Sequence, residues 1–420
     1  MDAREQRGLV IAAKCRIKRN GKEWIVPSQT KRGEKYTVVF EADQPRCTCH
    51  DFELRGCKCK HIYAVQYTIE REENDDGSVT VTETLTQTVK RKTYTQNWPA
   101  YNAAQQNEKL EFQVLLRDLC KGVPDLPASP KGGPHRIPHR DLIFSAVFKV
   151  YSTVSGRRFT CDLRDAFDKG FISRAPHYTS VFNILESPAT FDLLKALVVE
   201  SAIPLKILET NFACDSSGFS GCRFERWYDH KFGEHKFKRA WVKTHIMTGV
   251  KTNAVTAVEI HEQYSNDGPL LPPMLETTKQ NFTVNEVSAG LGYLSESNFQ
   301  AIADAGAAPF IPFKCNSAPT RDGIWNKMFH YFNLHRDEFL SRYHQRSNVE
   351  TTFSMVKAKF GDSVRSKTDV AMKNEVLCKL ITHNLCCIIQ TSYESGLCPE
   401  FWVKGACNSF CVSRAGYVSC

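Results

Sequence analysis

The feature that most constrains the fold is a cluster of cysteine and histidine residues near the N-terminus. In the segment RCTCHDFELRGCKCKHIYAV, the pair Cys47-x-Cys49 is followed after nine residues by the pair Cys59-x-His61. Three thiolates and one imidazole form a standard tetrahedral set for structural Zn²⁺. Two close-spaced pairs that clamp one ion fix a small ββα-like unit that could not otherwise hold a core. We therefore expect a zinc-stabilised module over residues 47–61.

Two further residues inside this segment compete as ligands. Either Cys57 or His50 could replace a member of the two pairs, and coincidental clustering in a cysteine-rich chain is the alternative to any metal site. Only Cys59 forms a C-x-H pair with His61, so we assign the zinc to the four residues of the two pairs. Four ligands leave no open coordination position, which predicts a structural zinc rather than a catalytic one.

The spacing of the two pairs resembles that of the SWIM zinc finger, a C-x-C…C-x-H module found with several transposases and chromatin-associated proteins. The resemblance implies that the second pair starts a helix, KHIYAVQYTIE, and that the module positions DNA or another protein. Lys and Arg outnumber Asp and Glu over residues 1–40, which favours DNA. The whole chain has 55 basic and 46 acidic residues, a net charge of +9 that also indicates a polyanionic partner.

Composition argues against a membrane protein and an exported one. No uncharged apolar run reaches the ~18 residues that a membrane helix needs, and the N-terminal segment MDAREQRG lacks the apolar stretch of a secretory signal. We therefore expect the seventeen cysteines to stay reduced. The contents of 42% hydrophobic and 24% charged residues are typical of a globular chain.

Composition also divides the chain into five segments. Residues 1–70 form a basic region with the finger, and residues 71–140 are polar and then rich in proline, as expected of a linker. Residues 141–203 show helical patterns, and this unit either binds DNA as a helix-turn-helix or packs structurally. Residues 204–395 alternate between strand-like and helical runs, which predicts an α/β domain. Residues 396–420 are a C-terminal tail.

Short elements can be placed within two of these segments. In the N-terminal region, the alternation over 35–40 predicts a strand. In the α/β segment, strands are expected at 207–212, 240–247, 253–261, 282–293 and 309–313. Helices are expected there at 296–305, 325–342 and 345–360.

The segment SRYHQRSNVETTFSMVKAKFG carries the strongest pattern of functional groups. Tyr343, Arg346, Glu350 and Lys357 follow one another at spacings of three, four and seven residues, which places them on one narrow face of a helix. That face presents a phenol, a guanidinium, a carboxylate and an ammonium group. From periodicity alone, a solvated face with i,i+4 Arg–Glu pairing is the alternative.

The same four residues match, at every spacing, the Y-R-E-K signature of bacterial insertion-sequence transposases with a DDE catalytic domain. Three more stretches resemble that family. ACDSSGF resembles its first motif, where an Asp ends the first strand, and RAWVKTHIMTGVKTNAVTAVEI resembles the hairpin that follows. FTVNEVSAGLGYLSESNFQAI, with APFIPFKCN behind it, resembles the region of the second motif. The resemblance covers about residues 204–390.

This resemblance implies a ribonuclease-H-like α/β fold with a mixed five-stranded sheet and helices, preceded here by the helical unit and the zinc-finger module. Strand cleavage and transfer are in-line displacements at phosphorus, in which divalent ions activate the attacking oxygen and stabilise the leaving one. On this resemblance, the catalytic residues Asp215 and Glu350 bind Mg²⁺ or Mn²⁺, whose preferred ligands are carboxylate oxygens. Tyr343, Arg346 and Lys357 would hold the DNA backbone.

The resemblance also implies partners and a location. The partners are the DNA ends of an insertion sequence and its target, bound by a homodimer. The expected location is a bacterial cytoplasm, on the nucleoid.

One position departs from the family pattern. The second motif places an Asp directly after an Ala and before the Tyr that Tyr293 matches, whereas here Ala289 is followed by Gly290. Glu286 shares a face of the predicted strand with that position, but four residues along a strand span about 13 Å. Asp304, beyond the following helix, is a speculative substitute, and an alignment shifted by several residues is the other explanation.

The sequence is therefore compatible with two main functions. The first is a transposase that catalyses metal-dependent DNA cleavage and transfer, weakened because Gly290 supplies no carboxylate. The alternative is a catalytically inactive DNA-binding protein derived from a transposase. A zinc-finger adaptor for proteins is a third possibility, which leaves the C-terminal half unexplained.

Overall fold

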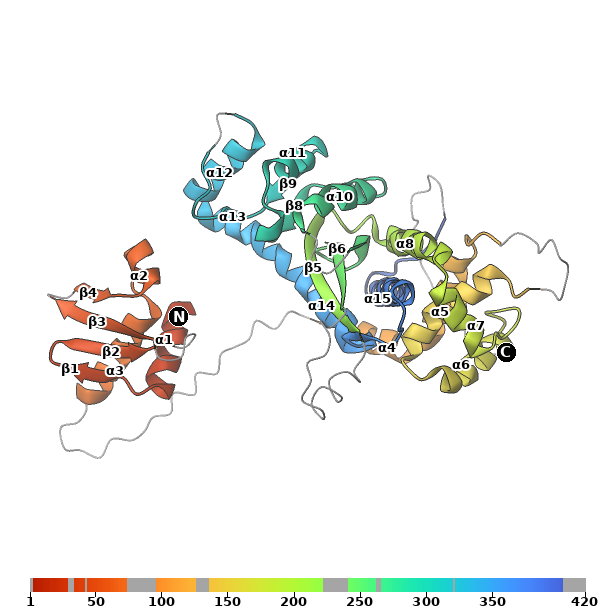
Figure 1. Cartoon of the computed structure of the whole chain (residues 1–420), viewed down its shortest axis with the longest axis horizontal. Helices are drawn as coiled ribbons and strands as arrows, with labels where there is room; N and C mark the ends of the chain where they lie inside the picture. Colours follow the sequence, from red (N-terminus) through yellow and green to blue (C-terminus); the bar gives the residue numbers. More distant parts are fainter. Residues whose placement is uncertain are drawn as a thin grey trace. The chain divides into compact units, whose positions relative to one another are not determined.

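The computed structural model of the chain describes residues 3–28, 34–41, 44–73, 96–125, 136–221, 241–261, 266–319 and 322–402. The chain forms two compact units, residues 1–94 and residues 95–420 (Figure 1). Each unit has its own hydrophobic core. Among the described helices, none is long and apolar enough to cross a membrane.

The N-terminal unit is a four-stranded antiparallel sheet with helices. The strands follow in the order β1 (Lys18–Asn20), β2 (Glu23–Pro27), β3 (Lys35–Glu41) and β4 (Gln44–Cys47), and β3 is the strand expected at 35–40. The helices are α1 (Ala3–Lys14), α2 (His50–Arg55) and α3 (Lys60–Glu73). Helix α3 contacts α1 and strands β2, β3 and β4. The hydrophobic core of the N-terminal unit is small, and it includes the three cysteines of the metal motif.

Helices α1 and α3 approach each other closely at Gly8. A Cβ atom added at Gly8 would lie 2.5 Å from Tyr63 Cβ and 2.9 Å from Lys60 O, closer than side-chain atoms tolerate. We expect Gly8→Ala to destabilise the N-terminal unit by about 1–3 kcal/mol, the usual cost of overpacking. Faster hydrogen exchange of the α1 and α3 amides in the full chain would show it. Exchange equal to that of the wild type, and to that of the control Val10→Ala, would contradict this close packing.

The C-terminal unit begins with helices. These are α4 (Trp98–Cys120), α5 (His139–Ser152), α6 (Gly156–Asp168), α7 (Tyr178–Glu186) and α8 (Ala189–Ala202), followed by the 3₁₀ turn η1 (Ile203–Leu205). Helix α4 lies inside the segment 71–140 that was expected to be a linker, where residues 74–95 and 126–135 are outside the described part. Helices α4, α5, α7 and α8 contact the long helix α15 (Asp369–Ser395), and they share one core with the sheet that follows.

The sheet of this unit has the order β7-β6-β5-β8-β9. Its strands are β5 (Asn211–Gly221), β6 (Trp241–Gly249), β7 (Val255–His261), β8 (Glu286–Ala289) and β9 (Ala308–Phe310). Strand β6 is antiparallel to both β5 and β7, whereas β8 pairs with β5 in parallel and β9 pairs with β8 in parallel. The expected mixed α/β, ribonuclease-H-like sheet is confirmed, and a short strand β10 (Ser363–Val364) adds a sixth member beside the end of β5.

The register of the sheet positions the functional residues. Residues Asn211–Cys214 of β5 pair with Glu286–Ala289 of β8, so Asp215 and Gly290 both follow directly after this paired stretch. Because the two strands are parallel, these residues emerge at the same end of the ladder. The expected strand at 282–293 is shorter than predicted because the chain turns at Gly290 into the 3₁₀ turn η3 (Leu291–Tyr293).

The remaining elements are helical. They are the 3₁₀ turn η2 (Gly268–Leu270), α10 (Leu271–Lys279), α11 (Glu296–Asp304), α12 (Ile324–Leu334), α13 (Arg336–Tyr343), the 3₁₀ turn η4 (His344–Arg346) and α14 (Ser347–Phe360). The helix expected at 325–342 is interrupted at His335, whose backbone leaves helical geometry with φ −120° and ψ 49°. Helix α14 contacts β5 and β6 and runs beside β5 in Figure 1.

Candidate metal and nucleic-acid sites

The four predicted zinc ligands lie together in the N-terminal unit. Their ligand atoms are all within 4.8 Å of one another, and all four residues are buried. Cys47 ends β4, Cys49 precedes α2, Cys59 precedes α3 and His61 lies in the first turn of α3. The Nδ1 atom of His61 is 3.8 Å from Cys47 Sγ and 3.9 Å from Cys59 Sγ, so this nitrogen faces the thiols.

The two competing residues lie outside this cluster. The Cys57 thiol is exposed and accepts a hydrogen bond from Arg4 at 3.0 Å. The His50 side chain is 84% exposed. The hydrogen bond between Cys47 and Cys59 lowers the pKa of Cys59 and raises that of Cys47, and burial raises the pKa of Cys49. The donor set of three sulfurs and one nitrogen therefore fits a closed, tetrahedral zinc site.

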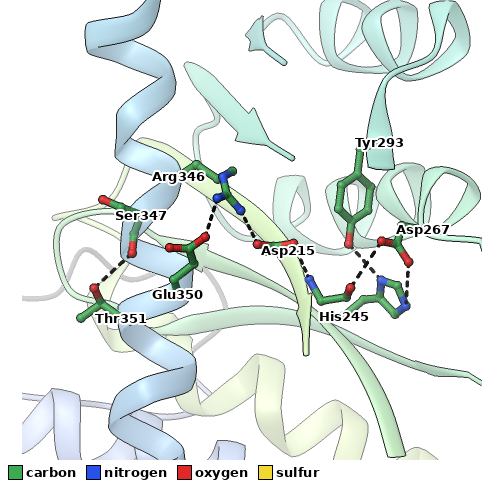
Figure 2. Close-up of polar contacts among 9 residues, drawn as sticks. Asp215, His245, Asp267, Tyr293, Arg346, Ser347, Glu350 and Thr351 are labelled. Atoms are coloured by element: carbon green, nitrogen blue, oxygen red, sulfur yellow. Dashed lines mark hydrogen bonds and ion pairs between the residues drawn. The ribbon is translucent and has the colours of Figure 1, made fainter. Parts of the chain in front are cut away.

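A second cluster joins the sheet to α14 in the C-terminal unit. Figure 2 shows the guanidinium of Arg346 between two carboxylates, where Nη1 binds Asp215 Oδ2 and Nη2 binds Glu350 Oε1. One planar guanidinium thus brings together two acids that are far apart in the sequence. The Asp215 side chain is 21% exposed and that of Glu350 is 57% exposed, so the cluster opens towards solvent on the α14 side.

The four residues of the stripe do not belong to one continuous α-helix. Tyr343 ends α13, Arg346 belongs to η4, and Glu350 and Lys357 lie in α14, which corrects the single helix face expected for these four residues. The helix expected at 345–360 is found as α14, which begins at Ser347. The helical path nevertheless keeps them near β5. Arg346 lies 5.9 Å from the ring centre of Tyr343. The ammonium of Lys357 donates a hydrogen bond to Ser217 Oγ on β5 at 2.6 Å.

Gly290 lies beside Asp215 and Arg346 of this cluster. A Cβ atom added there would lie 3.7 Å from Arg346 Nη1 and 3.8 Å from Asp215 Oδ1, which is ordinary contact. Its backbone, with φ −71° and ψ 167°, is extended and accepts any side chain. The structure thus brings Gly290 beside Asp215 and Arg346, and a glycine adds no carboxylate there.

Neither of the two other acids considered from the sequence occupies that place. Glu286 forms an ion pair with Arg342 at 3.0 Å and accepts a hydrogen bond from Asn211 at 3.2 Å. Asp304 accepts a hydrogen bond from Gln300 of its own helix at 2.7 Å. Among the residues that the structure describes, no third carboxylate lies within ligand distance of both Asp215 and Glu350.

The environment of the cluster shifts the pKa values of Asp215, Arg346 and Lys357. Burial raises the pKa of Asp215, although the Ser216 N–H and the Arg346 charge oppose this effect. Burial alone would lower the pKa of Arg346, but the nearby charges of Asp215 and Glu350 outweigh it and raise the pKa. Burial lowers the pKa of Lys357. Burial and the positive charge of Arg346 thus shift the pKa of Asp215 in opposite directions.

Sequence reasoning missed Asp267, which forms a separate polar group. Asp267 binds Lys243 Nζ at 2.5 Å, and its other oxygen lies 3.4 Å from Ser216 Oγ. His245, whose pKa burial lowers to about 4, lies between Asp267 and the Tyr293 hydroxyl, 2.9 Å from Nδ1 (Figure 2). Because successive strand residues face opposite sides of a sheet, the contact with Ser216 places Asp267 on the face opposite Asp215.

Comparisons with known protein families agree with this arrangement. A family model described as a transposase DDE domain matches residues 208–385. Another described as a SWIM zinc finger matches residues 36–69. No curated protein and no solved structure matches the chain. The first match contains the cluster around Arg346, and the second contains the four clustered zinc ligands.

Proposed function

We propose that this chain, which is a DDE transposase with an N-terminal SWIM zinc finger, cleaves and transfers DNA strands with Asp215 and Glu350 as its catalytic carboxylates. The observation that supports this assignment is the convergence of both acids on Arg346 at the end of the β5–β8 ladder. Two carboxylates that face one cation offer the hard oxygen ligands that Mg²⁺ or Mn²⁺ prefers. A divalent ion bound there would activate the attacking oxygen and stabilise the leaving one.

Arg346 has two roles in this proposal. Without DNA, its guanidinium neutralises Asp215 and Glu350, and the pKa of Arg346 is raised accordingly. When a DNA phosphate arrives, the same guanidinium can bind two of its oxygens, because its fork of N–H donors matches phosphate geometry. Moving Arg346 onto the phosphate would free both carboxylates at the point where the scissile bond is held.

Two more residues of the stripe would hold the DNA backbone. Lys357 carries an ammonium beside β5, and its hydrogen bond to a neutral serine hydroxyl leaves its charge uncompensated by that partner. Tyr343 lies beside Arg346 at the end of α13. Contacts of this kind position a nucleic acid without reading its sequence. The proposed specificity for the transposon ends would then come from the basic region 1–70 with its finger.

A second candidate function is favoured by one observation, the absence of a side chain at Gly290. With two carboxylates instead of three, at least one metal ion would bind weakly, and Arg346 would remain between Asp215 and Glu350. The chain would then bind DNA without transferring strands. We propose weak cleavage as the first candidate and this DNA-binding role as the alternative.

A cleavage assay with the purified full-length chain tests the proposal. The substrate is end-labelled DNA that carries the sequences flanking the coding region, with Mg²⁺ or Mn²⁺. We expect the wild type to nick this DNA, and Glu350→Gln to be at least about tenfold slower, a loss of about 1.4 kcal/mol of transition-state stabilisation. Asp304→Asn, a change in an acid that binds Gln300 instead, is the matched control.

The possible results separate the two candidates. A wild-type cleavage rate that survives Glu350→Gln would remove the catalytic assignment. DNA binding without cleavage in either metal would favour the second candidate. The same material tests the proposed homodimer, because two copies acting on paired ends require complexes that contain two chains and two DNA ends. The bacterial origin and the nucleoid location belong to the same proposal and rest on the insertion-sequence resemblance.

A further inference from the structure

A cavity of about 300 Å³ lies among the helices of the C-terminal unit, and its lining includes none of the proposed catalytic residues. It is formed by the end of α5, the start of α6, one side of α7, the segment after β10 and the first turns of α15. The end of α14 also contributes, through Phe360. The proposed function gives this cavity no role.

The charged groups of the cavity are mostly basic. The lining has four cationic side chains and two acidic ones. The cations are Lys149, Arg365, Lys367 and Lys379, and the acids are Glu186 and Glu375. Glu375 already accepts hydrogen bonds from the backbone N–H groups of Arg365 at 3.0 Å and Ser366 at 2.8 Å. The buried Lys379 donates to two backbone carbonyls at 2.8 Å. The two acids offset two of the four positive charges, so the lining keeps a net positive charge.

Lys149 is the group that most requires a partner. Its side chain lies in the cavity wall with only 8% of the residue exposed. Within the described parts of the chain, the ammonium has no hydrogen bond and no ion pair, and it lies 5.9 Å from the centre of the Phe159 ring. Burial and the charge of Arg365 lower the pKa of Lys149 to about 8, although the charge of Glu375 opposes them. A largely buried lysine without a hydrogen-bonded partner favours the binding of an anion beside it.

A second feature of the wall also favours an anion. Ser155 and Gly156, at the start of the 13-residue helix α6, line the same cavity. The first N–H groups of a helix lack partners within the helix, and the helix dipole makes this end positive. In α6 the Ser155 hydroxyl accepts a hydrogen bond from one of them, the Arg158 N–H, at 3.5 Å. A phosphate at such an end receives backbone hydrogen bonds as well as favourable charge. Beside these polar groups, the wall includes apolar side chains, among them Val154, Leu185 and Phe360.

We propose that this cavity binds an organic phosphate. Its phosphate group would lie between the Lys149 ammonium and the start of α6, and its organic body would lie against the apolar side chains of the wall. A compound of the size of a nucleoside monophosphate suits the volume of the cavity. Such a group could come from a free nucleotide or from the end of a DNA strand.

Calorimetric titration of the full-length chain with deoxyadenosine monophosphate tests this proposal. We expect this probe to bind, and deoxyadenosine and inorganic phosphate to bind at least about tenfold more weakly. Deoxyadenosine lacks the phosphate group, and inorganic phosphate lacks the organic body that would contact the apolar side chains. Lys149→Met keeps the apolar length of the side chain and should weaken binding of the probe at least about tenfold, or about 1.4 kcal/mol. Lys169→Met, which removes an exposed lysine paired with Asp165, should leave it unchanged.

Two further measurements make the result unambiguous. Circular dichroism establishes that Lys149→Met is folded, and Lys367→Ala, a change in an exposed residue of the rim, should weaken binding about two- to fivefold. Equal affinity in the wild type and Lys149→Met, or no binding of the probe at about 10 mM, would overturn the proposal. A 5′-phosphorylated oligonucleotide that displaces the probe would identify a DNA end as the source, whereas failure to displace it would identify a free nucleotide. Neither result depends on strand cleavage.

Discussion

Gly290→Asp is expected to raise the rate of metal-dependent strand cleavage about 100-fold, which corresponds to about 2.7 kcal/mol of transition-state stabilisation. A Cβ at this position would lie 3.8 Å from Asp215 Oδ1, so a carboxylate there would join Asp215 and Glu350. The extended backbone accepts the new side chain, and the nearest atoms leave room for it. The third carboxylate would also compete with Asp215 and Glu350 for the guanidinium of Arg346, and it would strengthen the binding of a divalent ion.

The matched control for this substitution is Gly290→Asn, which has the same shape without the charge. We expect Gly290→Asn and Gly290→Ala to cleave no faster than the wild type. Initial cleavage rates across a range of Mn²⁺ concentrations would show whether Gly290→Asp also lowers the metal concentration needed for half-maximal rate. If Gly290→Asp and Gly290→Asn behaved alike, a missing carboxylate would not explain the activity of the natural chain.

The sequence predicted the zinc site, whose ligands are close in the chain, better than the carboxylate cluster, whose residues are far apart in the chain. The C-x-C and C-x-H pairs are close in the chain, so their spacing alone indicated a metal site, and the structure brings these residues together. The proximity of Asp215 and Glu350 could be expected only from the family resemblance, because no periodicity links a strand residue to a helix residue so far away. The place of Gly290 beside Asp215 depends on the parallel register of β5 and β8, which only the folded chain reveals.

Two differences have simple physical causes. Helix α4 was not expected, because its segment is polar on average, yet Phe112, Leu115 and Leu119 form an apolar stripe that faces the core. The 3₁₀ turn that contains Arg346 was also missed, because 3₁₀ and α-helical turns present nearly the same residue pattern over three residues. Asp267 precedes a helical turn, where an acid is usually read as a cap, so nothing in the sequence set it apart.

Removal of zinc is expected to unfold the N-terminal unit while the C-terminal unit stays folded. The N-terminal core is small, and it includes the three cysteines of the metal cluster. A structural zinc contributes about 10 kcal/mol or more at neutral pH, which equals or exceeds the whole stability of a typical small domain. The C-terminal unit has a larger core of its own and contains no similar cluster among its described residues.

Cys59→Ser and chelation should therefore have the same effect. We expect one zinc per chain in the wild type by mass spectrometry, none in Cys59→Ser, and loss of hydrogen-exchange protection throughout α1 and α3 in both cases. Cys57→Ser is the matched control, because this thiol is exposed and lies outside the cluster, and it should keep both the zinc and the protection. Protection of α3 that persists in Cys59→Ser would mean that the apolar core alone holds the unit. Unchanged protection of α15 in every sample would show that the two units unfold independently, as their separate cores lead us to expect.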